Sequence, residues 1–287
     1  MRKIFLLVAV FAMMLPSMMS AADKDSGEVI AKEFILEDFD GLKAGNRFDV
    51  ELEHSSWYSV TVTLPAELEA YLDVKVENGN LVLGLNNTSQ KIISLFKDKD
   101  WKIKAKVSCP DMERIHLSGA AKLTMLDEFR VSSLDIKVSG ASSLDRALFK
   151  GDGNISLNAS GASHAELELS GNYSSAEIKC SGASNLYVSG GKYDRCYIDA
   201  SGASDMEMEN VGFADVSVEL SGASKLLLSG SADFLNVDAG GASSCKAASL
   251  VADRARVEAS GASSVTVNAK SMDYTDISRS SSFINRR

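Results

Sequence analysis

Hydrophobic and polar residues alternate around a four-residue word that recurs through most of this chain. The word is Ser-Gly-Ala-Ser or a close variant, and its copies begin at positions 118, 139, 160, 181, 201, 221, 240 and 260. Successive copies are 19 to 21 residues apart, and a further step of 20 leads to a decayed ninth copy at Ser280–Phe283. A repeat of this length is typical of a solenoid.

Two stretches of each repeat alternate with period two when the copies are aligned on the first residue of the word. The positions three residues before the word are all aliphatic, and the positions five and seven residues after it are mainly apolar, with polar neighbours on either side. This alternation predicts one half-buried strand that enters each word, one that leaves it, and a variable turn between repeats. Arg146 alone interrupts the second apolar column, and we expect a β-bulge there.

Two short strands in each repeat of about 20 residues predict an all-β protein, a right-handed parallel β-helix over residues 111–285. In the word, glycine permits a sharp corner and alanine is expected to fill the space where the two walls meet. Replacing Ala183 or Ala203 by leucine should therefore overpack the corner, at a cost of about 1–3 kcal/mol. Stacked serines are expected to hydrogen-bond along the ladder.

Residues 31–110 are less regular and predict a β module that caps the N-terminal end of the solenoid, either as a separate domain or continuous with it. Asn78-Gly79 indicates a hairpin turn, and residues 65–71 suit one short helical turn. Trp57 and Trp101 are expected in the core of this module, and Phe283 and Ile284 at the other end of the array. The expected strands are Phe48–Leu52, Tyr58–Leu64, Leu72–Val76, Leu81–Leu85 and Lys102–Val107.

The first 22 residues have the charge, apolar core and small-residue order of a secretory signal peptide, ending at Ser20-Ala21-Ala22. Residues 23–30 are expected to form a flexible N-terminus. Since no later segment approaches the roughly 20 apolar residues of a membrane span, we expect an exported protein in the periplasm, on the cell surface or outside the cell. Removing Arg2 and Lys3 with the signal changes the net charge from -9 to -11, which disfavours nucleic acid as a partner.

The four cysteines do not predict disulfides, although the chain is expected to be exported. Cys180, Cys196 and Cys245 occupy different positions relative to the word, and stacked coils bring equal positions together. Cys180 and Cys196 would lie about 13 Å apart along neighbouring strands, beyond the reach of a bridge. We interpret these three as small core residues and find no evident partner for Cys109.

One outward column carries a candidate metal site. The position two residues before the word is acidic in four consecutive repeats, where Asp199, Glu219, Asp238 and Glu258 should lie about 4.8 Å apart. A calcium ion would relieve the repulsion between these carboxylates. The alternative is a solvated face, partly neutralised by Lys179 and Arg256, with no cofactor.

Outward tyrosines are the candidate ligand-binding residues. Tyr187 and Tyr197 should project to the surface, where flat rings could stack on sugar faces, although scattered surface tyrosines are common. Tyr173 and Tyr193 fall in the variable turns. His54, His116 and His164 occupy different registers, and no acid, base and nucleophile share a column, so we expect a protein that is not an enzyme.

The chain resembles the auto-transporter adhesin head GIN domain family of exported bacterial proteins from about residue 31 to residue 284. The resemblance rests on Phe48-Asp49-Val50-Glu51-Leu52, on Gly79-Asn80-Leu81-Val82-Leu83, and on Lys106-Val107-Ser108-Cys109-Pro110 running into Ile115-His116-Leu117-Ser118-Gly119-Ala120, followed by the serial words. It implies a β-helical fold and a role in adhesion, and it implies no catalytic residues.

These observations favour a nonenzymatic β-solenoid that presents flat faces to a protein or glycan ligand, in adhesion or envelope interaction. The first alternative is a carbohydrate-active protein similar to polysaccharide lyases and hydrolases, since such enzymes often use parallel β-helices. A groove with two or three close acids would favour that alternative. A purely structural envelope protein is the second.

Overall fold

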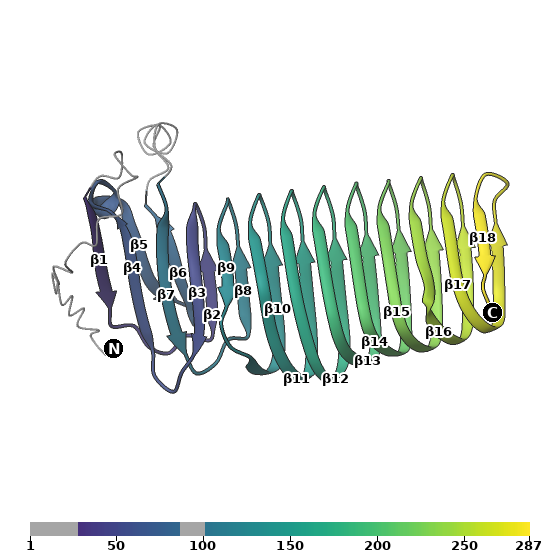
Figure 1. Cartoon of the computed structure of the whole chain (residues 1–287), viewed down its shortest axis with the longest axis horizontal. Coiled ribbons are helices and arrows are strands. Elements are labelled where there is room, and N and C mark those ends of the chain that lie inside the picture. The colour runs from purple at the N-terminus through teal and green to yellow at the C-terminus, as the bar shows by residue number, and fades with distance from the viewer. Residues whose placement is uncertain (1–27, 87–100) are drawn as a thin grey trace, which may run out of the picture.

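The computed structural model describes residues 28–86 and 101–287, which form an all-β solenoid of about nine turns with coils about 20 residues apart. The coils stack in one straight row from the N-terminal to the C-terminal end (Figure 1). This confirms the fold class predicted from the repeats. The predicted signal peptide lies outside the described residues.

The regular part of the solenoid is built from strands that pair in parallel with their counterparts one coil away. The pairing joins equal positions of successive repeats, such as Ile178 with Ile198 and Ile198 with Val218. The strands are β8 (Arg114–Leu117), β9 (Lys122–Met125), β10 (Phe129–Val138), β11 (Ser143–Ala159), β12 (His164–Cys180), β13 (Asn185–Ala200), β14 (Asp205–Leu220), β15 (Lys225–Ala239), β16 (Ser244–Ala259), β17 (Ser264–Ile277) and β18 (Ser282–Asn285).

Each of β11 to β17 is one strand of 14 to 17 residues that runs through the variable segment, whereas two strands separated by a turn were predicted. Residues with positive φ lie near the middle of several of these strands, including Gly171 in β12, Asn210 in β14 and Gly230 in β15. A single left-handed residue redirects the chain while its neighbours keep pairing with the adjacent coil. The segment therefore bends without ending the strand.

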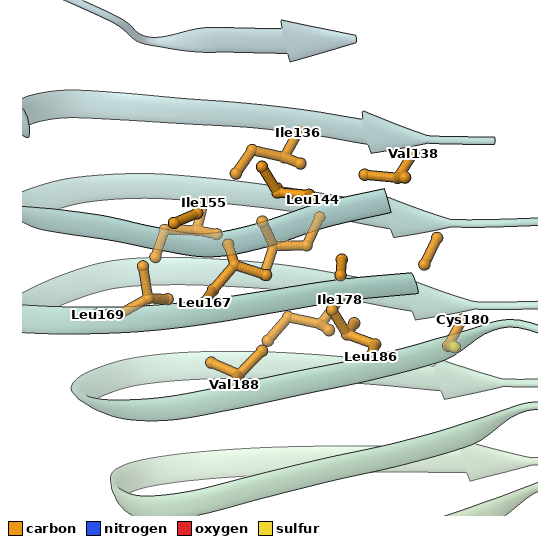
Figure 2. Packing of buried hydrophobic residues seen from close by; sticks show 14 of the residues in the cluster. Ile136, Val138, Leu144, Ile155, Leu167, Leu169, Ile178, Cys180, Leu186 and Val188 are labelled. Atoms are coloured by element: carbon orange, nitrogen blue, oxygen red, sulfur yellow. The ribbon is translucent and has the colours of Figure 1, made fainter. Parts of the chain in front are cut away.

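The inward columns form one continuous hydrophobic core along the solenoid. Figure 2 shows Ile136, Ile178, Leu167 and Leu186 pointing into the space between the two arms of their coils. Full burial of such a side chain stabilises the fold by about 1.5–3 kcal/mol.

The predicted bulge in β11 is present. Arg146 has a φ of 52°, and the pairing with β12 shifts between Leu144 and Ala147. Ala147 consequently takes the buried place in the column, and Arg146 is exposed.

The corner formed by the word has the opposite orientation to the one predicted. Its glycines have φ between +68° and +79°, and a Cβ on Gly202 would lie 2.6 Å from the carbonyl oxygen of Gly182. Only glycine fits this stack. The alanines that follow are exposed, so the placement of Ala203 inside the corner was wrong. From residue 142 onward, the buried side chain is the serine that ends each word.

Four of these buried serines, Ser163, Ser184, Ser204 and Ser263, donate to backbone carbonyl oxygens of the preceding coil. The serine-to-serine bonding predicted along the ladder occurs at Ser263, whose Oγ also lies 3.5 Å from that of Ser281. Ser163 and Ser204 each donate through Oγ to the carbonyl oxygen just before the preceding word, at 3.1 Å to Val138 and 3.2 Å to Cys180. A buried hydroxyl needs a hydrogen-bond partner, and these two serines find theirs in a carbonyl oxygen of the preceding coil. A methyl group, such as that of the exposed alanine, needs no partner.

An aromatic stack fills the bend end of three coils. The buried rings of Tyr173, Tyr193 and Phe213 follow one another at centroid distances of 5.6 Å and 5.5 Å. Tyr193 donates its hydroxyl to the carbonyl oxygen of Gly190 at 3.1 Å. The sequence placed Tyr173 and Tyr193 in surface turns, and the burial of this stack corrects that placement.

The last coil is shifted by two residues from the predicted register. Ala259 pairs with Ile277 and Ser264 with Ser282, so the ninth word is Ser278–Ser281 and not Ser280–Phe283. Phe283 packs partly buried against the core, and Ile284 is 51% exposed.

The N-terminal strands continue the solenoid across residue 110. The coil of β2 and β3 pairs in parallel with β8 and β9 on one side and with β6 and β7 on the other. Figure 1 shows this order along the row. The elements are β1 (Val29–Phe34), β2 (Gly41–Ala44), β3 (Phe48–His54), β4 (Ser59–Pro65), the 3-10 helix η1 (Ala66–Tyr71), β5 (Leu72–Glu77), β6 (Asn80–Leu85) and β7 (Ile103–Cys109).

Antiparallel strands cover the N-terminal end of the row. β5 pairs with β6 through the predicted Asn78-Gly79 turn, β4 pairs with β7, and β1 pairs with β4. The predicted helical turn is η1, whose Leu68 is fully buried. Trp101 is buried as expected, but Trp57 is 70% exposed, which contradicts its predicted place in the core.

All four cysteines are buried and free. This confirms the core placement predicted from the register for Cys180, Cys196 and Cys245, and Cys109 lacks a disulfide partner as expected. Burial raises the pKa of the Cys196 and Cys245 thiols to about 12. These side chains are neutral core residues.

Candidate functional site

The two arms of each coil present different outward surfaces. We call the outward side chains that precede each word in β10 to β17, with those of β2 and β8, the entry face. The outward side chains that follow each word form the exit face. Each face keeps its columns in register because successive coils pair residue by residue.

The four predicted metal-site carboxylates stack on the entry face. Asp199 pairs with Glu219, Glu219 with Asp238, and Asp238 with Glu258. A fifth acid, Asp276, continues the column because the last coil is shifted by two residues. Aligning the repeats of the chain does not reveal Asp276, because a regular 20-residue step puts Ser278 at this position of the column.

The pKa of Asp238 is raised, by partial burial first and then by Glu258 and Glu219. Basic and aromatic groups offset part of this repulsion. The Arg256 guanidinium contacts Glu258, donating from Nε at 3.2 Å, and Tyr197 donates its hydroxyl to Glu219 at 2.8 Å. Burial and then Glu219 raise the pKa of Tyr197 to about 12.

Within residues 28–86 and 101–287, no three His, Cys, Asp or Glu side chains converge as a metal-binding group. Calcium binding by neighbouring acids of the column remains a prediction. If calcium binds there, millimolar calcium should raise the melting temperature relative to chelator.

Tyr187 lies in a shallow groove of about 440 Å³ on the exit face. It is half-buried and donates its hydroxyl to Glu209 at 3.0 Å, and this bond is the largest cause of its raised pKa. Tyr187 and Tyr197 therefore lie on opposite faces and do not form one site. The groove is lined by Leu186, Leu226, Leu227, Met206, His164, Asn185, Asp205, Glu207, Lys225, Ser244 and Lys246.

Acidic and basic side chains share this groove. Lys225 forms an ion pair with Asp205 at 3.6 Å. The pKa of Glu207 is raised by burial first and then by its neighbour Glu209. The sequence pointed to Tyr187 but not to these acids, because they come from the next coil.

The three histidines are dispersed over the molecule. His116 is on the entry face, 3.0 Å from Asp135, and His164 lines the groove on the exit face. His54 packs edge-on against Phe129 at 5.4 Å between ring centroids.

Family comparison matches residues 38–211 and 174–284 to the family described as "Putative auto-transporter adhesin, head GIN domain". The chain belongs to this family. Comparison with curated proteins gives no match. No helix of the described residues is long and apolar enough to span a membrane.

Solved structures share the fold at low sequence identity. A "putative adhesin" from Parabacteroides merdae has 15% identity and a TM-score of 0.57, covering 91% of this chain and 97% of its own. A "Putative lipid binding protein" from Parabacteroides distasonis has 16% identity and a TM-score of 0.60, covering 91% and 98%. A "putative adhesin" from the same species has 16% identity and a TM-score of 0.59, covering 88% and 98%. This likeness establishes the solenoid fold.

Proposed function

We propose that the protein is an exported, nonenzymatic binding module that holds a surface ligand on the flat outer faces of its solenoid. The family points to adhesion. The observation that carries the proposal is the residue-by-residue register of the coils, which repeats outward side chains at a spacing of about 4.8 Å. A polymer or a cell surface can contact such a row at several points, so weak single contacts add through multivalency.

The groove at Tyr187 is the proposed contact for a glycan. A tyrosine ring offers a flat apolar surface, and the neighbouring carboxylates and lysines can hydrogen-bond to hydroxyl groups. Lipid is a second ligand class, suggested by the name of one structural neighbour and by the leucines of the groove.

The test is binding of the chain without its predicted signal peptide to a glycan array, to whole cells and to lipid vesicles. Tyr187→Ala should lower retention on the bound ligand several-fold if the exit face binds it. Tyr197→Ala is the matched control, because it removes a half-buried tyrosine from the opposite face. Absence of binding on all three supports would contradict the proposal.

A carbohydrate-active protein is the alternative, favoured by Glu207 and Glu209 beside the groove. Release of reducing sugar or unsaturated product from a polysaccharide, abolished by Glu207→Gln, would establish it. Turnover without retention on any surface would overturn the binding proposal.

A further inference from the structure

One outward column of the entry face changes the sign of its charge at its midpoint. Backbone pairing places ten residues of this column in continuous register through β2, β8 and β10 to β17. The first five include no acid and the last five are all acids. In order they are Lys43, His116, Lys137, Asn158 and Lys179, then Asp199, Glu219, Asp238, Glu258 and Asp276.

This arrangement is complementary to itself in one orientation. A two-fold axis parallel to the strands, passing between the coils of Lys179 and Asp199, would set two entry faces together with their solenoids antiparallel. The first residue of the column in one copy then meets the tenth residue in the other copy, and the second residue meets the ninth. Lys43 faces Asp276, and Lys137 faces Asp238. A parallel arrangement would place like charges opposite each other.

The neighbouring outward column fits the same operation. Glu177 would meet Tyr197, and Asp135 would meet Asn236, so no like charges are opposed. Glu177 and Asp135 already pair with Lys179 and Lys137 of their own chain, so the contacts across the axis would add to these ion pairs. Arg256 would meet Arg114, and each of these guanidinium groups already contacts an acid of its own chain.

The dimensions suit a stable interface. The ten positions span about 43 Å at the spacing of paired strands. A third outward column lies two residues further from the word and consists of Ser133, Asn154, Ser175, Arg195, Asp215, Phe234 and Arg254. Three outward columns with their side chains are about 18 Å wide, so each copy would bury roughly 800 Å², the usual size for a specific complex. Figure 1 shows the coils in a straight row, so the faces can meet along their length.

We propose that the entry face is a homodimer interface, in which two copies associate antiparallel about a two-fold axis through the middle of the charged column. Such an interface is isologous: each contact occurs twice. The exit faces, with the groove at Tyr187, would then point outward on both sides of the dimer and stay accessible.

Sedimentation equilibrium of the chain without its predicted signal peptide, in chelator, tests the proposal. We expect a dimer whose dissociation constant rises as sodium chloride increases from about 50 mM to about 500 mM. Lys137→Glu and Asp238→Lys should each weaken the dimer by about tenfold or more, because each reverses two symmetry-related contacts.

Mixing the two variants is the decisive measurement. In the mixture, the glutamate at 137 meets the lysine at 238 and the native Lys137 meets the native Asp238, so a heterodimer should form. Residues 137 and 238 are about 24 Å apart within one chain, which excludes rescue inside a monomer. Lys43→Glu and Asp276→Lys provide a second pair in case either first variant folds poorly.

Lys246→Glu is the control, since it makes the same charge change on the exit face and should leave the dimer unchanged. A wild-type monomer at roughly 100 µM in low salt would overturn the proposal. A dimer indifferent to the four entry-face changes, or a mixture that stays monomeric, would do so as well. Dimerisation only with added calcium would also overturn it, because the acids would then act by binding the ion and not by pairing with the basic half of the second copy.

Discussion

The coil of β2 and β3 and the coils of the repeat array have the same backbone but different corners. In the array, each corner glycine from Gly140 onward lies against the corner glycine of the previous coil, and a Cβ would come 2.6–2.8 Å from its carbonyl oxygen. In the β2 and β3 coil, Asn46 occupies the corresponding place with a φ of 56°. Its side-chain oxygen accepts a hydrogen bond from the backbone of Leu85 at 3.2 Å.

This difference shows that turning the chain within one coil and stacking one corner on another place different demands on the corner residue. One residue in the left-handed conformation turns the chain, and asparagine adopts that conformation more readily than most residues. Glycine is required only when another tight corner is stacked directly against the Cβ position. The glycine of the word is therefore a consequence of stacking on the corner of the preceding coil.

The largest effect should come from the aromatic stack of Tyr173, Tyr193 and Phe213 in the regular coils. Tyr193→Ala removes the middle ring and leaves a cavity, so we expect a loss of about 4 kcal/mol in the free energy of unfolding measured in urea. Trp57→Ala, at an exposed N-terminal ring, should change it by less than about 0.5 kcal/mol. Equal effects would show that the stack contributes nothing beyond surface packing.

The corner comparison is tested directly by alanine at the two equivalent positions. Gly202→Ala should destabilise by about 3 kcal/mol, since it adds both backbone strain and a clash with Gly182. Asn46→Ala should cost about 1–2 kcal/mol, through the lost hydrogen bond to Leu85 and the poorer fit of alanine to a positive φ, but without a clash. Thermal unfolding of both variants measures the two losses of stability. A smaller loss for Gly202→Ala than for Asn46→Ala would contradict the proposed role of glycine in stacking.

Two buried thiols, one in the N-terminal region and one in the repeat array, can show whether these regions unfold together. Burial raises the pKa of Cys109 in the N-terminal region and of Cys245 in the array to about 12. The folded state then keeps protons that the unfolded chain loses above about pH 9. Stability should fall as pH rises from about 9 toward 12, by about 1.4 kcal/mol per pH unit for each thiol.

At pH 8 neither thiol should react with a thiol reagent until denaturant is added. Because strand pairing continues across residue 110, we expect Cys109 and Cys245 to react over the same denaturant range. Reaction of Cys109 well before Cys245 would show instead that the N-terminal region unfolds by itself.

Buried serines give a smaller, matched contrast inside the array. Ser204→Ala removes the bond to the Cys180 carbonyl and should cost about 1 kcal/mol. The hydroxyl of Ser224 is buried without a hydrogen-bond partner among the described residues, so Ser224→Ala should be neutral or slightly stabilising. Chemical denaturation of the two variants side by side measures the difference, and identical losses would argue against it.

The smallest effect is expected at the exposed alanine of the word. Ala203→Leu adds a side chain toward solvent and should change the melting temperature by no more than about 2 °C. A large drop would restore the inward placement that the sequence suggested. Ala203→Ser is a suitable control for polarity.

Much of the fold could be predicted from the sequence because period-two alternation and strand pairing follow local rules. The aliphatic column through Ile136, Ile178 and Val218 identified the core, and the misplaced Arg146 identified a bulge. The orientation of the corner could not be predicted, because alanine and serine are both small. The serine is buried whether its hydroxyl bonds to a carbonyl, as Ser204 does to Cys180, or has no partner among the described residues, as at Ser224. The backbone of the corner, with its glycine at positive φ, therefore decides which side chain turns inward.

Only part of the candidate sites could be predicted from the sequence. Asp199 to Glu258 share one position of the repeat, so counting from the word revealed four acids. Asp276 belongs to the same column only after the two-residue shift in the last coil. The groove around Tyr187 is lined by residues of five successive coils, from β12 to β16, so its acids are recognised only once the coils are stacked around that ring.

The sequence by itself determined the solenoid, its period, its inward columns and the free state of its cysteines, because these depend on patterns that repeat every 20 residues. Tertiary structure decided the burial of Tyr193, the exposure of Trp57, and the addition of the β2 and β3 coil to the row. The burial of Tyr193 depends on the bend in the variable segment of its coil, and the β2 and β3 coil depends on pairing between segments that share no repeated sequence. Pairing is made by the peptide groups that every residue carries, so the side-chain pattern alone does not specify it.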